Sequence, residues 1–328
     1  MTGPTRRSLL RATPALALAP TLATPASAQG FPSRPIRILV TIGAGSAADI
    51  LTRSLADELG RRLGQNVVTE NRPGAGGNIA GDVARRAEPD GHTLLMATVS
   101  THGINPALYS RMPFDPVADF APITLVASSP NVLVVHPSSP IQNLADLIAA
   151  ARARPGELTY SSGGSGTSQH LGGAVLEQMT GVRLTHVPFR SAPDSVNAVL
   201  AGTTSMTFAS VPVALSQVRA GALRAIGLSS AAPMPDWPEV RPLAEIGLPG
   251  FDVAAWFGLV APANTPAPII ARLHEATREA LQVPAVRERL ANQGMQILDA
   301  DPAGFASFIQ AEIARWAPIV RASGATAG

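Results

Sequence analysis

Short runs rich in β-branched residues alternate with amphipathic segments along the chain from residue 31 onward. This alternation is typical of layered α/β proteins, in which helices cover mostly parallel sheets. Capping residues mark several helix starts, among them Asn143, Thr167 or Ser168, and Thr265 with Pro266. The predicted strands are residues 36–42, 66–70, 93–98, 131–135, 158–161, 184–187, 205–209 and 223–228.

The chain length indicates more than one lobe. With 328 residues, the chain exceeds the commonest domain size of about 100–150 residues. We expect two α/β lobes joined by crossing strands near residues 130–135 and 250–259. The first lobe is predicted to hold residues 29–130 with 252–328, and the second residues 131–251. A long helix from about 302 to 321 is expected to close the chain.

The first 28 residues are interpreted as an export signal. They have a basic start, an apolar middle rich in Ala and Leu, and a small-residue end at Ala26-Ser27-Ala28, before Gln29. Arg6 and Arg7 match the twin-arginine pattern, and an ordinary secretory signal is the alternative. Residue 29 is not Cys, and no later run is apolar enough to span a bilayer. The mature protein is therefore expected to be periplasmic and soluble.

Two residue types are missing, and their absence excludes whole enzyme classes. The chain has no cysteine, and all 25 of its basic residues are arginine. Lysine Schiff bases, Walker lysines, thiol nucleophiles and thiolate metal sites are thus excluded. Loss of the first 28 residues leaves 22 basic and 23 acidic residues, a net charge of −1. The high isoelectric point of about 9.8 reflects arginine, so no nucleic-acid partner is expected.

A glycine-rich turn follows the first predicted strand. Gly43-x-Gly45-x-x-Ala48 precedes a helix and a second strand that ends at Glu70, which imitates a dinucleotide-binding unit. An exported oxidoreductase that uses NAD is therefore one alternative. However, backbone N–H groups at such a turn also bind small anions, carboxylates included. We favour the anion site, because no hydride-transfer acid and base follow in the sequence.

A second loop, residues 161–168, offers hydroxyl and amide donors without charge. It resembles a cradle for a carboxylate, with a structural helix cap as the alternative. A serine nucleophile is disfavoured, because neither Ser46 nor Ser165 lies in a complete Gly-x-Ser-x-Gly motif. The six histidines show no metal-ligand spacing, so no metal and no cofactor are expected. His170 is expected to hold this loop rather than a ligand.

Three charged residues at predicted strand ends or helix starts could contact a ligand or stabilise the fold. Asp49 lies in the first turn of a predicted helix, where an acid acts as a capping residue. Arg72 is expected to form a buried ion pair with Glu70. Arg190 follows a predicted strand end and is the cation best placed to reach between the lobes, with a solvated position as the equal alternative.

Seven sequence blocks together resemble the Bug family, the extracytoplasmic solute receptors of tripartite tricarboxylate transporters. They are FPSRPI (31–36), ENRPGAGGN (70–78), PDGHTLL (89–95), INPALY (104–109), DFAPI (119–123), GTSQHL (166–171) and WFGLVAP (256–262). The resemblance runs from about residue 31 to residue 321. It implies a periplasmic binding protein of type II-like architecture, with two α/β lobes that close on a small organic acid.

The resemblance also implies where the ligand lies. Loop amides, hydroxyls and water hold the carboxylate in such receptors. The site residues that we predict, from the resemblance and the reasoning above together, are Gly43, Gly45, Ser46, Ala47, Asn78, Ser100, Thr101, Ser162, Ser165, Gly166, Thr167, Ser168, Phe189, Arg190 and Ser210.

Two departures from the family pattern weaken any transfer of substrate identity. Residues 41–46 replace a Pro-Phe-x-Pro-Gly-Gly loop, and residues 205–210 lack an acid of the usual Asp-x-x-Phe-Asp strand. If Ala209 and Ser210 line the pocket, a ligand with a second anionic or an apolar end is favoured over one with an amine.

The expected function is thus a binding protein, not an enzyme. We expect it to be a monomer that delivers its ligand to the permease subunits of a membrane transporter. The alternatives are the exported NAD-type oxidoreductase and a ligand-sensing subunit of a membrane kinase.

Overall fold

The computed structural model describes residues 30–323 and 326–327, and the predicted signal peptide lies outside them. Residues 31–328 form one compact unit. The strands are β1 (Ile36–Val40), β2 (Val67–Asn71), β3 (Thr93–Thr98), β4 (Phe120–Val135), β5 (Thr159–Ser162), β6 (Thr185–Pro188), β7 (Met206–Ser210), β8 (Arg224–Leu228), β9 (Ala254–Pro262) and β10 (Gln296–Ala300).

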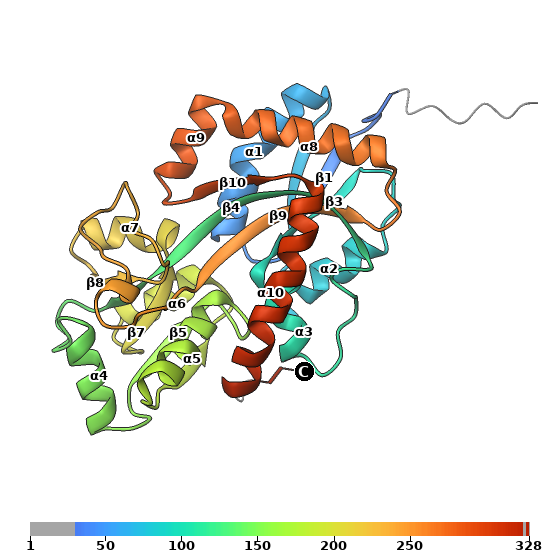
Figure 1. Cartoon of the computed structure of the whole chain (residues 1–328). Coiled ribbons are helices and arrows are strands. Elements are labelled where there is room, and N and C mark those ends of the chain that lie inside the picture. The colour runs from blue at the N-terminus through green and yellow to red at the C-terminus, as the bar shows by residue number, and fades with distance from the viewer. Residues whose placement is uncertain (1–29, 324–325, 328) are drawn as a thin grey trace, which may run out of the picture. The chain divides into compact units, whose positions relative to one another are not determined.

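The α-helices lie between these strands and at the chain's end (Figure 1). They are α1 (Ala47–Leu63), α2 (Asn78–Arg85), α3 (Asn105–Leu108), α4 (Leu144–Ala153), α5 (Ser168–Thr180), α6 (Ala192–Leu200), α7 (Val211–Arg219), α8 (Ala267–Gln282), α9 (Pro284–Ala291) and α10 (Pro302–Ser323). Short 3-10 helices cover Ala75–Gly77 and Leu243–Glu245, and a π-helix covers Ser100–Ile104. The α/β fold class and the final helix are confirmed.

The strands form a continuous sheet in the order β2-β1-β3-β9-β4-β7-β5-β6, with β8 and β10 paired to β4. Strands β1, β2 and β3 pair in parallel, as do β5, β6 and β7. The pairings of β4 and β9 are antiparallel. The prediction of parallel strands therefore holds for β1 to β3 and for β5 to β7, whereas β8 and β10 pair antiparallel with β4. The centre is antiparallel because the chain passes between the halves in both directions.

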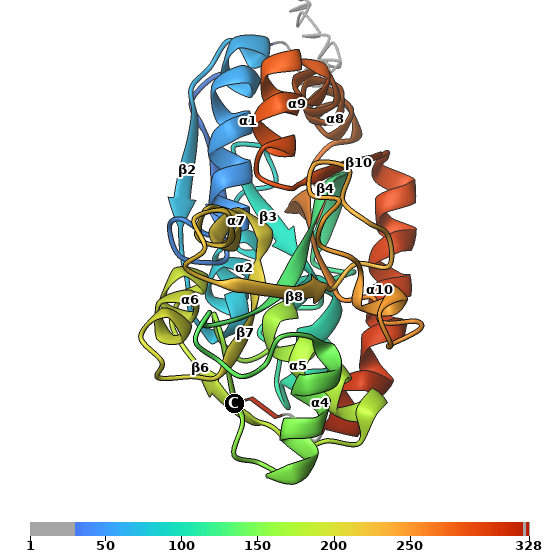
Figure 2. The same ribbon diagram turned by 90° about the vertical axis from the view of Figure 1, so that its left-hand side faces the viewer.

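Strand β4 joins the two halves of the sheet. Its residues up to Pro130 pair with β9, whereas those from Asn131 onward pair with β7 and β8. Almost every residue of β4 is buried, as expected for a strand covered on both faces. The chain returns near Val253, whose N–H donates to the carbonyl of Ser229 at 2.7 Å. Figure 1 shows β4 and β9 running together through the molecule, and Figure 2 shows β4 in the view turned by 90°.

We call the part built on β1, β2, β3, β9, β10 and the start of β4 the first lobe. The second lobe is built on β5 to β8 and the end of β4. The pairings place the crossings where the sequence predicted them. The lobe limits, 29–130 with 252–328 and 131–251, stay predictions.

Helix α10 packs against β4 and crosses the first lobe (Figure 1). Its buried Glu312 accepts hydrogen bonds from the indole N–H groups of Trp256, at 2.7 Å, and Trp316, at 2.8 Å. Phe305, also on α10, packs edge-on against Trp256. This aromatic cluster fixes α10 on β9, the central strand that pairs with β4.

Candidate functional site

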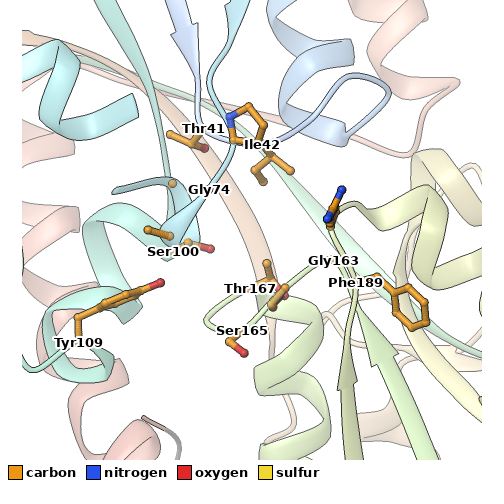
Figure 3. A pocket seen from close by; sticks show the side chains of 15 residues that line it. Thr41, Ile42, Gly74, Ser100, Tyr109, Gly163, Ser165, Thr167 and Phe189 are labelled. Atoms are coloured by element: carbon orange, nitrogen blue, oxygen red, sulfur yellow. Dashed lines mark hydrogen bonds between the residues drawn. The ribbon is translucent and has the colours of Figure 1, made fainter. Parts of the chain in front are cut away.

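Two adjoining chambers lie between the lobes. The outer chamber has a volume of about 500 Å³ and the inner one about 50 Å³. Ile42, Ser100, Gly163 and Thr167 line both. Figure 3 shows the outer chamber, whose lining is Thr41, Ile42, Pro73, Gly74, Ala75, Gly76, Gly77, Ser100, Tyr109, Gly163, Gly164, Ser165, Thr167, Phe189 and Arg190.

Helix N-termini from both lobes meet at the inner chamber. Its lining includes Ala47 at the start of α1, Ser168 at the start of α5 and Ala192 at the start of α6. The N-cap hydroxyls of Ser46 and Thr167 each accept from a first-turn backbone N–H at 3.3 Å. Such helix ends carry partial positive charge and unpaired N–H groups, so they favour a small anion.

The parallel strands explain why these helices converge. Strands β1 and β5 end just before the loops that lead into α1 and α5. In open α/β sheets, ligands bind beyond the carboxyl ends of such strands. The loop of the first lobe also approaches the second lobe, because a Cβ atom built on Gly43 would lie 3.9 Å from Cβ of Ser191.

The described side chains that line the chambers carry positive charge and no negative charge. Among the described residues that line them there is no Asp or Glu, and Arg190 is the single charged side chain. Arg190 is exposed and forms no ion pair with any residue in the described ranges. It thus both lines the outer chamber and meets solvent, which combines the two alternatives weighed from the sequence. A cation without a nearby acid favours an anionic ligand.

Three buried polar atoms at the chambers have no hydrogen-bond partner within the described part of the chain. They are Oγ1 of Thr41, Oδ1 of Asn131 and Oγ of Ser210. Their residues are only 2%, 1% and 6% exposed. An unpaired buried polar group costs about 1–3 kcal/mol. These atoms are therefore natural contacts for a ligand or for bound water.

Nine of the predicted site residues line the chambers. Ser165, Phe189 and Arg190 line the outer one, Ser46, Ala47, Ser168 and Ser210 the inner one, and Ser100 and Thr167 both. The expectation about the ligand's second end assumed that Ala209 and Ser210 both line the pocket. Ser210 lines the inner chamber, whereas Ala209 lines neither chamber. A direct ligand contact by any of the nine stays a prediction.

The other six predicted residues, Gly43, Gly45, Asn78, Thr101, Ser162 and Gly166, do not line either chamber. The N–H of Gly45 donates to Oδ2 of the buried Asp49 at 3.0 Å, which supports the capping interpretation of that acid. Asn78 accepts through Oδ1 from Nδ2 of Asn105 at 2.7 Å. These contacts shape the loops, while a ligand contact by the six stays a prediction.

Several lining residues are absent from the predicted set, among them Thr41, Ile42, Tyr109, Asn131 and the segment 73–77. The glycines of that segment were a usable signal. Gly77 has a φ of 93°, and a Cβ atom there would lie 2.7 Å from Cγ2 of Thr101 and 2.8 Å from Cβ of Thr41. Only glycine therefore lets this backbone form the chamber wall.

Arg72 and Glu70 form the expected ion pair, with Nε of Arg72 2.5 Å from Oε1 of Glu70. The expected burial was wrong, because the two side chains are 48% and 30% exposed. Both residues stand at the end of β2, the edge strand of the sheet, where water reaches them.

Two stacked histidines, His170 and His186, hold the loop 163–167 and the preceding Ser162 through side-chain contacts. The rings of His170 and His186 lie 4.1 Å apart and nearly parallel. Nδ1 of His170 accepts from the N–H of Gly166 at 3.1 Å, and Nε2 of His186 lies 2.7 Å from Oγ of Ser162. The structural role expected for His170 is therefore supported by a contact with the loop itself.

The lowered pKa values of these two histidines predict that the free energy of unfolding decreases in acid. Burial lowers the pKa of His170 from 6.5 to about 4, and burial with the charge of His170 lowers the pKa of His186 to about 3. The unfolded chain binds these protons near pH 6.5, so their contribution is complete above pH 6.5 and is lost as the pH falls toward 4 and 3. We expect a loss of at most about 1.4 kcal/mol per pH unit for each histidine.

Urea unfolding at several pH values between 7.5 and 4.5 checks this slope. His186→Gln, which retains a polar partner for Ser162, should make the slope shallower. A free energy of unfolding that is flat over this range, or an unchanged slope in the variant, would contradict the assignment.

A family model described as "Tripartite tricarboxylate transporter family receptor", TctC, matches residues 51–325. Protein BugT of Bordetella pertussis is 35% identical over 305 residues, covering 93% of this chain and 94% of the relative. A protein in the tcbD-tcbE intergenic region of Pseudomonas sp. (strain P51) is 36% identical over 291 residues, covering 88% and 86%. The chain belongs to the TctC family of receptors, and the resemblance to Bug proteins is confirmed.

Solved structures agree with the two-lobe fold. Rpa4515 of R. palustris, solved with adipate, is 31% identical and superposes with a TM-score of 0.87, covering 90% of this chain and 99% of the other. MatC of Rhodopseudomonas palustris, solved with bound malate, is 32% identical with a TM-score of 0.83, covering 88% and 100%. The two-lobe binding-protein architecture is thus confirmed.

The described residues offer neither a membrane-spanning helix nor a metal-binding cluster. None of the helices within residues 30–323 and 326–327 combines the length and apolarity needed to cross a membrane. Within the same ranges, no three or more His, Asp or Glu side chains gather closely enough to hold a metal ion.

Proposed function

We propose that this protein is a non-enzymatic receptor that captures a small organic carboxylate between its lobes and delivers it to membrane permease subunits. The observation that carries the proposal is the meeting of the N-termini of α1 and α5 at chambers where, among the described residues, no acidic side chain contributes to the lining. The relatives solved with adipate and with malate, both carboxylates, support it.

The residues divide the work of binding between the lobes. The α1 end, with Ser46 and Ala47, belongs to the first lobe, and the α5 end, with Thr167 and Ser168, to the second. Backbone N–H groups of both ends attract the carboxylate, and the hydroxyls add direction. A ligand held from both sides favours the closed arrangement of the lobes, with the strand crossings near residues 130 and 253 as hinges.

Thermal unfolding against a panel of acids tests the proposal. The panel holds mono-, di- and tricarboxylates, aromatic acids and NAD, each added to the purified protein. A ligand at about 100 times its dissociation constant stabilises the folded state by about 2.7 kcal/mol. A clear rise in Tm with one class of acids supports the receptor. A rise with NAD and with no acid would contradict it and favour an oxidoreductase.

We infer further that residues 1–28 export the chain to the periplasm. The twin-arginine pattern at Arg6 and Arg7 and the small residues before Gln29 support this inference. The mass of the protein recovered from the periplasm should correspond to a chain that begins at Gln29. Replacement of both arginines by lysine should leave the precursor inside the cell. Export that proceeds unchanged would indicate the ordinary secretory route.

A further inference from the structure

Asn131 and Ser210 lie side by side in the lining of the inner chamber. Asn131 is the first residue of β4 in the second lobe, and Ser210 is the last residue of β7. The two are directly paired in the antiparallel register of these strands. Side chains of such a pair lie on the same face of the sheet, with Cβ atoms about 4.5–5.5 Å apart. Both line the chamber, and both are more than nine-tenths buried.

A hydrogen bond holds the side-chain amide of Asn131 in place and leaves its oxygen, Oδ1, without a partner among the described residues. Its Nδ2 donates to Oγ of Ser168 at 3.0 Å, and its backbone N–H donates to Oγ of Ser229 at 2.9 Å. Its Oδ1 has no partner within the described residues. An amide oxygen accepts hydrogen bonds and cannot donate them. This atom therefore calls for a donor and repels a carboxylate oxygen.

Ser210 differs from three other hydroxyl-bearing N-cap residues, two of them in the chamber lining and the third, Ser191, next to the lining residue Ala192. The hydroxyls of Ser46, Thr167 and Ser191 each accept from a backbone N–H of their own helix. Ser210 caps α7 without such a side-chain bond, and its buried Oγ has no partner in the described ranges. Its hydroxyl is thus free to donate or accept at the same place where Oδ1 of Asn131 needs a donor.

The size of the inner chamber limits what reaches these two atoms. Its volume is about 50 Å³, whereas one water needs about 10–15 Å³ measured in this way. Val99, Ala255 and Phe257 form its apolar walls. A hydroxyl next to a carboxylate fits this space, while the rest of a ligand extends into the outer chamber.

We propose that the ligand is a 2-hydroxy carboxylate, an inference that rests on the proposed function. The carboxylate lies at the N-termini of α1 and α5, and the neighbouring hydroxyl donates to Oδ1 of Asn131. Oγ of Ser210 donates to the oxygen of that hydroxyl. Ser168 links the hydroxyl site to the carboxylate site. Its Oγ accepts from Nδ2 of Asn131, and its hydroxyl proton remains free to donate to the carboxylate.

Isothermal titration with matched acids tests this selectivity. The pairs are malate with succinate, and 2-hydroxyglutarate with glutarate, the hydroxy acids as separate enantiomers. One enantiomer should bind at least about tenfold more tightly than the acid without the hydroxyl, as a hydrogen bond of about 1.4 kcal/mol requires. Ser210→Ala should lower this ratio several-fold, and Ser210→Thr should restore it. Ser307→Ala, an exposed position on α10, serves as the control.

The outcomes separate the two proposals. Equal affinity for both members of each pair would overturn the inference and leave the receptor in place, with the inner chamber occupied by water alone. A hydroxyl preference that Ser210→Ala leaves unchanged would also overturn it. Failure of every acid to bind would overturn the proposed function, and this inference with it.

Discussion

Thr167→Asp is expected to weaken carboxylate binding by at least about 100-fold. Thr167 lines both chambers and caps α5, so aspartate would place a negative charge beside the bound carboxylate. Two like charges about 4 Å apart repel by about 4 kcal/mol at the effective dielectric constant of a protein surface. Titration of the acid that gives the largest rise in Tm measures the loss.

Thr167→Asn is the matched control for this variant. Asparagine and aspartate are equally good N-cap residues, so both variants should retain α5. They have nearly the same size and differ in charge. We expect Thr167→Asn to lose less than about tenfold in affinity, because a single neutral hydrogen bond is worth about 1 kcal/mol. Equal losses in the two variants would contradict an anionic ligand at this place.

Gly258→Ala is expected to lower the free energy of unfolding by about 3 kcal/mol, the upper end of the cost of overpacking a core. Gly258 lies on β9 beneath α10, and a Cβ atom there would be 2.2 Å from Cζ of Phe305. Phe305 is completely buried and packs against Trp256, so its ring has little room to move. Urea unfolding of the purified variant gives the change.

A second substitution distinguishes this clash from other causes. Phe305→Leu removes the ring, so Gly258→Ala should cost much less in the double variant than alone. Residues in contact show coupling energies of about 0.5–3 kcal/mol in such cycles. If the two effects simply add, the ring of Phe305 is not what requires glycine at position 258.

The repetitive parts of the fold were predictable from the sequence. Periodicity placed β3 at its observed bounds and the other predicted strands within two residues, except for the start of β4, and caps placed the starts of α4 and α5. Strand β10 was not predicted. Buried and exposed residues do not alternate along it, and most of it is exposed to solvent. The first half of β4 and its antiparallel pairings depend on long-range contacts that no local pattern records.

The parts of the site formed by local strand-to-helix turns could be predicted from the sequence. Ser46 and Thr167 lie at strand-to-helix turns, where their residue types indicate N-caps, and both line the chambers. Tyr109 and Asn131 could not be found in this way, since each reaches the chambers through packing of distant segments. Gly45 and Gly166 line neither chamber, and a ligand contact by them stays a prediction. Their backbone N–H groups donate to Asp49 and His170, each four residues further along the chain, in agreement with the capping and loop-holding roles expected for those two residues.

The central claim is that a carboxylate lies between the helix ends of the two lobes. A crystal structure of the protein with the acid that most raises its Tm tests this claim most directly. We expect the carboxylate within hydrogen-bond distance of the N-terminal residues of α1 and α5, with Ser46, Thr167 or Ser168 among its contacts. Density for the acid outside these chambers, or contacts from one lobe alone, would contradict it.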